Sequence, residues 1–352
     1  MFTYDYLPAI GGGGRHVVEV CKRLPAGEIV VFSGQRNDLE DHRSAWPGLP
    51  HGFVKQLLLS VWLNLRIRTH VRRLALKAVN VHSGPGGLFL VRSAGAPLIV
   101  TAHHTYAQQV ERLPSQFWKR LFIPFERGTL RRADKVICVS EDTQRAVVER
   151  YGIAREKTVV IPNGIDTAVF RPQPDVERTQ KSVLFLSRLE KRKGVDFLLR
   201  AMRLVASEDK SVKLFIGGKG SLAPTLKNYV AENGLSEQVE FLGFVPDVGL
   251  PSWYARVGCF VMPSVFEGFG IPVLEAMACG TPVIGTNVDG IRGLIDDGKT
   301  GLLVDFGDET GLAERILRVC GGGFTPPTDL AERIRENYDW DGVAERYAGL
   351  LL

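Results

Sequence analysis

Short apolar runs rich in β-branched residues alternate along the chain with longer amphipathic stretches. This alternation predicts βαβ units, and therefore parallel sheets that helices cover on both faces. The pattern is interrupted once, where turn residues gather around Pro162, Gly164 and Pro172, and it then restarts. We expect a short first strand at residues 2–7, then strands at residues 29–32, 78–82, 98–101, 136–139 and 159–161, and again at 182–187, 213–216, 239–242, 259–262 and 283–286.

The interruption divides the chain into two domains. Its 352 residues are roughly twice the ~150 expected of one domain. We predict an N-terminal Rossmann-like domain over residues 1–170, a second one over residues 171–337 and a terminal segment over residues 338–352. Doubly wound domains of this kind bind ligands in a cleft at the carboxyl ends of their strands.

Composition narrows the class of protein. Hydrophobic residues make up 45% and charged residues 24% of the chain, which is typical of globular proteins and excludes intrinsic disorder. The five cysteines form no CxxC motif, which favours buried thiols in a reducing compartment. The longest apolar stretch, residues 57–65, is too short to cross a bilayer, and residues 1–8 show no secretory signal. We expect a soluble, cytoplasmic protein.

Positive charge is concentrated in the first half of the chain. Residues 1–175 carry 24 Lys and Arg against 15 Asp and Glu, a net charge of +9, whereas the remainder has a net charge of −4. No acidic residue lies between Asp41 and Glu111. A surface of this kind attracts nucleic acid, anionic lipid or a phosphorylated substrate.

Residues 53–77 are predicted to form one helix with a basic face. The separations of its cations are close to whole helical turns. The same face carries Trp62 together with Lys55, Arg66, Arg73 and Lys77. This helix either lies on an anionic membrane surface or exposes a solvated basic face, and the pattern does not separate the two interpretations.

Four consecutive glycines, residues 11–14, precede a predicted helix at residues 15–24. Free backbone N–H groups at a helix start form an anion site. A dinucleotide-binding fingerprint is the rival interpretation. However, His16 stands where its third glycine belongs, and Asp38 is too distant to hold a ribose. The loop therefore disfavours an NAD-dependent dehydrogenase, whereas a tight turn without a ligand stays open.

A strand-to-helix junction in the second half places Arg188 and Lys193 close together. Two cations at such a junction suit a diphosphate, because Arg pairs with two oxygens and Lys acts as a point charge. A solvated basic loop is the alternative, and we interpret Lys191 and Arg192 in that way.

Residues 263–280 run from a strand through a glycine-containing turn into an apolar helix. Glu267 precedes the turn, and Glu275 lies within the helix among Leu274, Ala276 and Met277. An unpaired buried carboxylate is costly, so Glu275 requires partners. Hydroxyl groups of a sugar or ribose would satisfy it.

Glu267 and Glu275, together with motifs along nearly the whole chain, resemble the retaining glycosyltransferases of family 4, which have the GT-B fold. In that fold two doubly wound Rossmann-like α/β domains have parallel sheets that face each other across a cleft. The other matching motifs are Gly11-Gly12 with Arg15-His16, residues 100–103, 137–141 and 161–166, Arg188 with Lys193-Gly194, and residues 298–304.

The resemblance implies a donor site for a nucleotide-diphosphate sugar such as a UDP- or GDP-sugar. Arg188 and Lys193 would neutralise the diphosphate, including the charge that grows as the glycosidic bond breaks. Glu275 would hold the ribose, and Glu267 would contact the transferred sugar. The remaining donor contacts would be Gly11, Gly12 and Gly13, the turn Gly268, Phe269 and Gly270, and the base-reading segment near Val245.

The resemblance also implies roles on the acceptor side. His103 matches a cleft histidine beside the donor sugar, whereas His104 stands where many relatives have Asp. Arg188, Lys193, His103 and Glu267 would be the catalytic set, with a phosphate oxygen taking the acceptor proton. No nucleophile, metal or other cofactor is implied. The N-terminal domain would bind the acceptor, and the last helix would cross back to it.

We therefore predict transfer of a sugar to a lipid-linked or cell-envelope acceptor, with Arg66, Arg73, Lys77 and His104 on the acceptor or membrane side. Two alternatives remain: the same chemistry on a small soluble acceptor, and a non-catalytic nucleotide- or nucleic-acid-binding protein. No aromatic-basic interleaving of the RNA-binding kind is present, so we expect no nucleic-acid partner.

Overall fold

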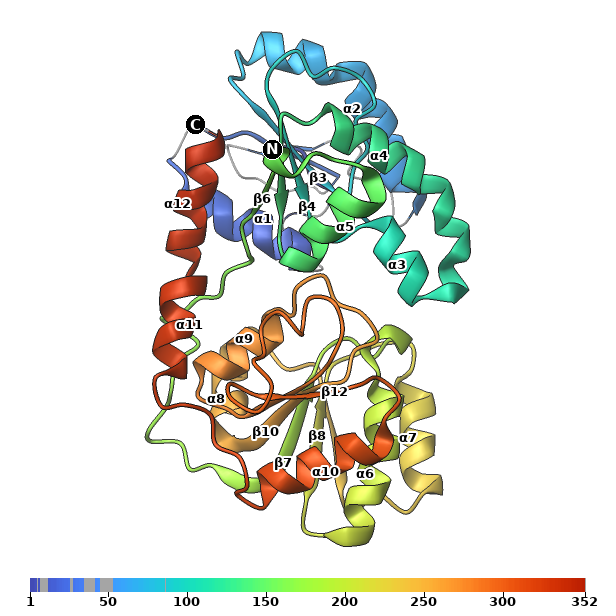
Figure 1. Cartoon of the computed structure of the whole chain (residues 1–352), viewed down its shortest axis with the longest axis vertical. Helices are drawn as coiled ribbons and strands as arrows, with labels where there is room; N and C mark the ends of the chain where they lie inside the picture. The colour runs from blue at the N-terminus through green and yellow to red at the C-terminus, as the bar shows by residue number, and fades with distance from the viewer. Residues whose placement is uncertain are drawn as a thin grey trace. The chain divides into compact units, whose positions relative to one another are not determined.

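The structure is a computed structural model that describes residues 1–4, 6, 12–25, 28–34, 42–44, 53–85 and 87–351 (Figure 1). These residues form two compact units. The first unit contains residues 1–164 and 340–352, and the second contains residues 165–339. The chain thus leaves the first unit between Gly164 and Ile165 and returns to it between Asp339 and Trp340.

The first unit is built on a parallel sheet with the strand order β3-β4-β5-β6. Its strands are β3 (Val79–Ser83), β4 (Leu98–Ala102), β5 (Lys135–Cys138) and β6 (Thr158–Val160). β1 (Val31–Ser33) and β2 (His42–Ser44) form a separate parallel pair. Phe2 makes single bridges to Phe32 and Val81. Among the described residues, the predicted strand at residues 2–7 is present only as these bridges.

Helices pack around this sheet (Figure 1). They are α1 (Gly12–Arg23), α2 (Phe53–Arg73), α3 (Tyr106–Arg112), the 3-10 segment η1 (Pro114–Phe122), α4 (Ile123–Arg132), α5 (Glu141–Tyr151), the short turn η2 (Arg155–Lys157) and α12 (Trp340–Leu351). α12 packs against α1 because Trp340 and Tyr347 join Val20 and Leu24 in one buried apolar cluster. The last helix therefore belongs to the core of the first unit.

The second unit contains a six-stranded parallel sheet in the order β12-β11-β10-β7-β8-β9. The strands are β7 (Thr179–Leu186), β8 (Lys213–Gly217), β9 (Val239–Gly243), β10 (Val257–Met262), β11 (Val283–Thr286) and β12 (Leu302–Val304). The helices are η3 (Lys191–Lys193), α6 (Val195–Glu208), α7 (Ala223–Glu232), η4 (Asp247–Gly249), α8 (Leu250–Arg256), α9 (Ile271–Ala278), α10 (Glu309–Cys320) and α11 (Leu330–Tyr338). β10 is buried along its whole length, as expected for a strand with helices on both faces.

The predicted α/β class and the doubly wound arrangement are confirmed. Each of the ten expected strands beyond residue 28 has its counterpart, and β2 and β12 are additional strands that the apolar pattern did not indicate. Both are only three residues long, which is too short for a clear alternation.

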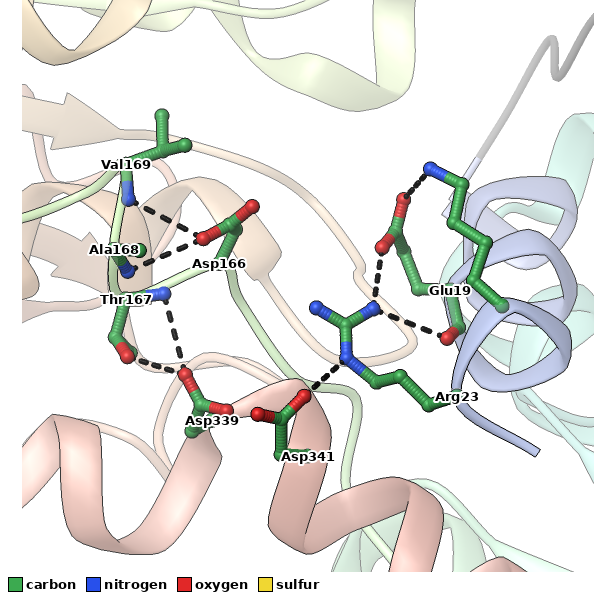
Figure 2. Close-up of polar contacts among 9 residues, drawn as sticks. Glu19, Arg23, Asp166, Thr167, Ala168, Val169, Asp339 and Asp341 are labelled. Carbon is green, nitrogen blue, oxygen red and sulfur yellow. Dashed lines mark hydrogen bonds and ion pairs between the residues drawn. The ribbon is translucent and has the colours of Figure 1, made fainter. Parts of the chain in front are cut away.

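Hydrogen bonds and ion pairs lie close to the two points at which the chain passes from one unit to the other (Figure 2). Each of these contacts joins residues of the same unit. In the second unit, Asp339 accepts hydrogen bonds from the backbone N–H and the hydroxyl of Thr167, and Asp166 caps the following turn. In the first unit, Arg23 of α1 pairs with Asp341 at 2.6 Å and with Glu19 at 2.7 Å. Side-chain hydrogen bonds therefore fix the backbone where it enters and leaves each unit.

Helix α2 ends four residues earlier than the predicted helix over residues 53–77. Ala75 has a φ of 48°, which breaks the helical hydrogen-bond pattern. Lys77 therefore lies beyond the helix, and the prediction that it shares a helical face with Arg66 and Arg73 is wrong.

Candidate functional site

The turn η3 connects β7 to α6 in the second unit. Gly194, which follows η3, has a φ of 67°, in the left-handed region that favours glycine. A Cβ atom on Gly194 would lie 1.9 Å from the carbonyl oxygen of Pro263. Glycine is therefore needed to bring η3 against the segment that follows β10.

This close approach joins Lys193 to Glu267. The Lys193 Nζ lies 2.6 Å from Glu267 Oε1, and the Ser264 hydroxyl donates to the same oxygen at 2.7 Å. Both charged side chains are buried. A buried ion pair with an additional hydrogen bond retains both charges where an isolated charge would be too costly.

The pKa of Glu267 reflects this balance. Burial alone would raise it, but Lys193 and Arg192 outweigh burial and hold the pKa at about 2. Burial lowers the pKa of Lys193, and the ion pair with Glu267 opposes that change. We assign the pair as ionised, because the geometry places a short charge-assisted hydrogen bond between the two groups.

Two arginines extend the cationic cluster. Arg192 reaches Glu267 Oε2 at 3.4 Å and Glu190 at 3.6 Å. The interpretation of Arg192 as a solvated loop residue is therefore wrong. Arg188 is half-exposed and pairs with Glu190 at 2.8 Å. Arg188 is also close enough to Lys193 to lower its pKa. The cluster thus presents a guanidinium on the surface beside a buried ion pair.

The turn after Glu267 leads into α9 and lies close to a second loop. Gly270 has a φ of 101° and immediately precedes α9. A Cβ on Gly290 would lie 2.7 Å from Glu267 O and Phe269 N. The backbone of Gly268 to Gly270 therefore comes close to another backbone segment at the start of a helix, where N–H groups face an anion favourably.

Glu275 lies on α9, the helix that follows Glu267 and the Gly268–Gly270 turn. It is buried, and the Tyr254 hydroxyl donates to its Oε2 at 3.0 Å. The predicted requirement for hydroxyl partners is thus met in part by a side chain of α8. Val245, the predicted base-reading position, follows β9, and its side chain lies 3.0 Å from where a Cβ of Gly217 would be.

Three histidines meet in the first unit, of which His16 and His82 are buried and His103 is half-buried. His82 lies near the end of β3, and its Nδ1 lies 3.0 Å from Nε2 of His103, which follows β4. The ring of His16 lies edge-on to that of His103 at 5.1 Å, and its Nδ1 lies 2.6 Å from the Asn163 Oδ1. Burial lowers the pKa of His16 to about 3 and that of His103 to about 4, and it lowers that of His82 as well. The cluster is therefore neutral at physiological pH.

Hydrogen-bond satisfaction assigns the protons of this cluster. His82 Nε2 is buried and has no hydrogen-bond partner among the described residues. A buried N–H group without an acceptor is costlier than a bare lone pair. His82 therefore donates from Nδ1 to His103 Nε2, which leaves the proton of His103 on Nδ1.

The glycine turn of the first unit lies beside this cluster. A Cβ on Gly13 would lie 3.6 Å from the His103 ring, so the predicted residues Gly13 and His103 are brought together. Gly12 begins α1, and Gly11 lies outside the described residues. His104, the next residue after His103, is half-buried.

The predicted basic face of residues 53–77 is only partly present. Arg66 and Arg73 are exposed on α2. Lys55 is buried, with its aliphatic chain 2.8 Å from where a Cβ of Gly34 would be. Trp62 packs with Phe32 at 6.0 Å, so Lys55 and Trp62 do not share an exposed face with the arginines.

Several site residues were missed by sequence reasoning. His82 could have been found, because it ends a predicted strand adjacent to the one that precedes His103, and parallel strands end at the same sheet edge. Ser264 lies three residues before Glu267 within the same motif. Arg192 and Tyr254 carry no local signal, since their roles depend on tertiary contacts.

None of the helices in the described part of the chain is long and apolar enough to span a bilayer. No disulfide links the cysteines within the described residues, and Cys138, Cys259, Cys279 and Cys320 are buried, as their sequence contexts predict.

Known families match both halves of the chain. Residues 10–169 match glycosyltransferase family 4, and residues 166–338 match the glycosyl transferases group 1. A GDP-mannose-dependent alpha-(1-6)-phosphatidylinositol monomannoside mannosyltransferase of Mycolicibacterium smegmatis is 34% identical over 74% of this chain and 72% of its own length. The chain therefore belongs to the family 4 glycosyltransferases. It is thus a transferase enzyme, and the resemblance seen in its motifs is confirmed.

Other relatives differ in acceptor and in coverage. A D-inositol 3-phosphate glycosyltransferase of Paenarthrobacter aurescens is 30% identical over 78% of this chain and 69% of its own length. An uncharacterized glycosyltransferase of Methanocaldococcus jannaschii is 32% identical over 60% of this chain, which spans 58% of that relative.

Solved structures establish the GT-B fold. Sucrose-phosphate synthase from Thermosynechococcus elongatus superposes with a TM-score of 0.82 at 22% identity, over 99% of this chain and 94% of that one. HepE from Anabaena, solved in complex with UDP-glucose, superposes with a TM-score of 0.73 at 20% identity, over 99% of this chain and 98% of that one.

Proposed function

We propose that this glycosyltransferase moves a sugar, with retention of configuration, from a nucleotide-diphosphate sugar to a hydroxyl of a lipid-linked acceptor. The observation that carries the proposal is the ion pair of Lys193 with Glu267, flanked by Arg188 and Arg192. It places a cationic cluster beside a glycine turn at a helix start, which suits a diphosphate. HepE binds UDP-glucose and the mycobacterial relative depends on GDP-mannose, so a UDP- or GDP-sugar is the proposed donor.

The reaction exchanges one glycosidic bond for another. The bond between the sugar C1 and the phosphate oxygen breaks, and a bond forms between C1 and the acceptor oxygen on the same face. The acceptor proton passes to an oxygen of the leaving diphosphate. Arg188 and Lys193 stabilise the negative charge that develops on that leaving group, which is the part of catalysis we assign to them. These cations supply the counter-charge, so we propose that no divalent metal is required.

Glu267 has a binding role in this proposal. A carboxylate with a pKa of about 2 is a poor base at neutral pH, and Lys193 and Ser264 already occupy one of its oxygens. Glu267 thus orients Lys193 and contacts sugar hydroxyls rather than attacking C1. We propose that Glu275 holds the ribose, since Tyr254 donates to one of its oxygens and the carboxylate can still accept from a diol.

The first unit supplies further proposed contacts. Gly12, Gly13 and His103 are proposed to bind the donor sugar and diphosphate, and His104 to lie on the acceptor side. The Nδ1 proton assigned to His103 makes it a neutral hydrogen-bond donor, which suits a sugar hydroxyl. This role requires no charge on the ring.

A phosphatidylinositol-type lipid is the proposed acceptor class. The mycobacterial relative is named for phosphatidylinositol monomannoside, and the exposed Arg66 and Arg73 give α2 a cationic surface that attracts anionic lipid. We accordingly propose that the enzyme acts in the cytoplasm at a membrane surface. A second candidate is a soluble inositol phosphate, which the name of the Paenarthrobacter relative favours.

The proposal is tested by product analysis. The enzyme would be incubated in EDTA with UDP-glucose or GDP-mannose and either phosphatidylinositol in vesicles or D-inositol 3-phosphate in solution. Nuclear magnetic resonance of the product would then report the anomeric configuration. We expect a product with the α configuration of the donor on the lipid. Product on the soluble acceptor alone would favour the second candidate, and a β product would contradict retention.

A further inference from the structure

Four large apolar side chains are exposed on the segment formed by η1 and α4. Phe117 is 67% exposed, Trp118 44%, Leu121 71% and Phe125 51%. We call these four residues the aromatic face. Burying such side chains normally stabilises a protein. Their exposure within one short segment therefore indicates a surface that binds a partner or a membrane.

The segment is anchored by its other side. Phe122 is buried, with its ring 6.0 Å from Phe89 and 5.3 Å from Tyr106. Glu126 is also buried and accepts hydrogen bonds from Tyr106 N and the Tyr151 hydroxyl. Phe117 and Leu121 are the most exposed of the four, whereas the Trp118 ring also lies 5.9 Å from that of Phe122 and the Phe125 ring 6.1 Å from that of Phe89. The segment is thus held firmly while the aromatic face stays outside the core.

The segment that carries the aromatic face is rich in cations. The segment and its immediate neighbours carry Arg112, Lys119, Arg120, Arg127, Arg131 and Arg132. Lys119 lies over the Trp118 ring at 5.7 Å. Of the two acidic residues nearby, Glu126 is buried and Glu111 pairs with Arg150. The rim of the aromatic face is therefore strongly positive.

Helix α2 presents a similar surface on the adjoining side. Val61 is 49% exposed and Leu65 66% exposed, close to Arg66 and Arg68. The N–H of Val91 donates to Asn64 of α2, and the Val91 side chain lies 3.8 Å from where a Cβ of Gly128 on α4 would be. The loop containing Val91 thus lies between the exposed parts of α2 and α4.

We infer that the aromatic face, with its rim of cations, docks onto an anionic lipid bilayer. Aromatic rings and long aliphatic side chains prefer the interface between headgroups and acyl chains, and each nearby Lys or Arg adds attraction to anionic lipid. A second copy of the chain would meet the same positive rim and be repelled, whereas an anionic bilayer matches both the apolar centre and the charge. This inference rests on the proposed function, since a lipid acceptor requires the enzyme to reach a membrane.

The test uses Trp118 as its own probe. The full chain would be mixed with vesicles of phosphatidylcholine, with and without phosphatidylglycerol, whose acyl chains carry bromine as a quencher of tryptophan fluorescence. We expect quenching only with the anionic lipid, and weaker quenching at high salt. Trp118→Phe should remove most of the quenching while still binding vesicles in a flotation assay. Equal quenching in Trp118→Phe would overturn the inference.

A double variant that introduces negative charge into the aromatic face completes the test. Phe117→Asp combined with Leu121→Asp should reduce vesicle binding by about tenfold or more. Val248→Asp is the matched control, because Val248 is 88% exposed in the second unit, and it should bind as the wild type does. Unchanged binding of the double variant would overturn the inference, and so would self-association in sedimentation that the double variant abolishes.

The outcome is separable from that of the proposed function. Vesicle binding requires no catalysis, and the double variant should keep the wild-type melting shift with UDP or GDP because neither Phe117 nor Leu121 is among the proposed donor contacts. Docking with transfer only to soluble inositol phosphate would contradict the lipid acceptor and leave the docking surface standing. A melting shift with nucleotide but no docking would overturn the inference alone.

Discussion

The two units place polar side chains near the carboxyl ends of parallel strands in opposite electrostatic states. In the second unit, Lys193 and Glu267 are buried as a charged pair at 2.6 Å. In the first unit, His16, His82 and His103 are neutral rings in contact, with His82 hydrogen-bonded to His103 and His16 to Asn163. Burial penalises charge in both places. The Lys193–Glu267 pair of the second unit provides its own counter-ions and remains ionised. No counter-ion lies among the described contacts of the histidines in the first unit, so these remain neutral.

This difference fits two kinds of ligand chemistry. A charged pair with adjacent guanidinium groups can exchange partners with a diphosphate, because the cations lose little by replacing one anion with another. Neutral imidazoles offer directed hydrogen bonds without attracting a phosphate. We expect the charged groups that bind the diphosphate to be those of the second unit, and uncharged sugar hydroxyls to lie near His103.

The largest effect is expected from Lys193→Met. The substitution leaves the Glu267 carboxylate buried with only Arg192 and Ser264 as partners, which should reduce the free energy of unfolding by about 3–5 kcal/mol. Chemical denaturation measures this directly. Lys181→Met is the matched control, because the exposed pair of Lys181 with Asp209 should contribute far less to stability than a buried pair. Equal effects of the two variants would contradict a buried ionised pair.

Arg188→Ala should separate catalysis from stability. Arg188 is half-exposed, so we expect a change of less than about 1 kcal/mol in the free energy of unfolding. Loss of its charge from the leaving group should lower kcat by about 10²–10³. Steady-state kinetics would check this against Arg335→Ala, which removes an exposed arginine elsewhere in the same unit. Wild-type kcat in Arg188→Ala would remove Arg188 from the mechanism.

Mild acid should destabilise the histidine cluster before the ion pair. The histidine pKa values lie below the ordinary 6.5 in the folded state, so the unfolded chain binds these protons first. Stability should fall as the pH drops from 6.5 toward 4, by up to about 1.4 kcal/mol per pH unit for each histidine. Glu267, with its pKa of about 2, loses its contribution only between about pH 4.5 and 2. A free energy of unfolding that is flat between pH 6.5 and 4.5 would show that the cluster is not buried and neutral.

A smaller effect is expected from Tyr254→Phe. Removal of the hydroxyl takes one hydrogen bond from Glu275 and should cost about 1–3 kcal/mol of stability. Nucleotide affinity should change little, because the proposed ribose contact uses the carboxylate itself. Tyr229→Phe, on the partly exposed face of α7, serves as the control, and its melting temperature should match the wild type.

Much of the fold could be predicted because apolar periodicity is a local signal. The parallel strands and the interruption between the two halves are visible as runs of a few residues. The end of α2 could not be predicted, because Ala75 adopts a positive φ that the residue types there do not indicate. β12 escaped detection because Leu302 to Val304 are flanked by turn residues and pair with β11 only through tertiary structure.

Site residues that belong to sequence motifs were predicted, whereas residues that reach the site only through tertiary packing were missed. Arg188, Lys193, Glu267 and Glu275 stand at characteristic spacings, and the structure joins Lys193 to Glu267. Arg192 was interpreted, with Lys191, as a solvated cation, yet it turns back onto Glu267. Lys55 showed the converse error, because helical spacing placed it with exposed arginines whereas its side chain is buried and lies close to Gly34.

The central claim is that the charged cluster of the second unit binds a nucleoside diphosphate without a metal. A thermal-shift titration with UDP, GDP and ADP in EDTA, on the wild type and on Arg188→Ala and Glu275→Ala, tests it most directly, because a ligand bound to the native state raises the melting temperature with its saturation. We predict that UDP or GDP raises the melting temperature of the wild type and that both variants lose the shift. A shift that requires magnesium, or one that both variants retain, would contradict the account.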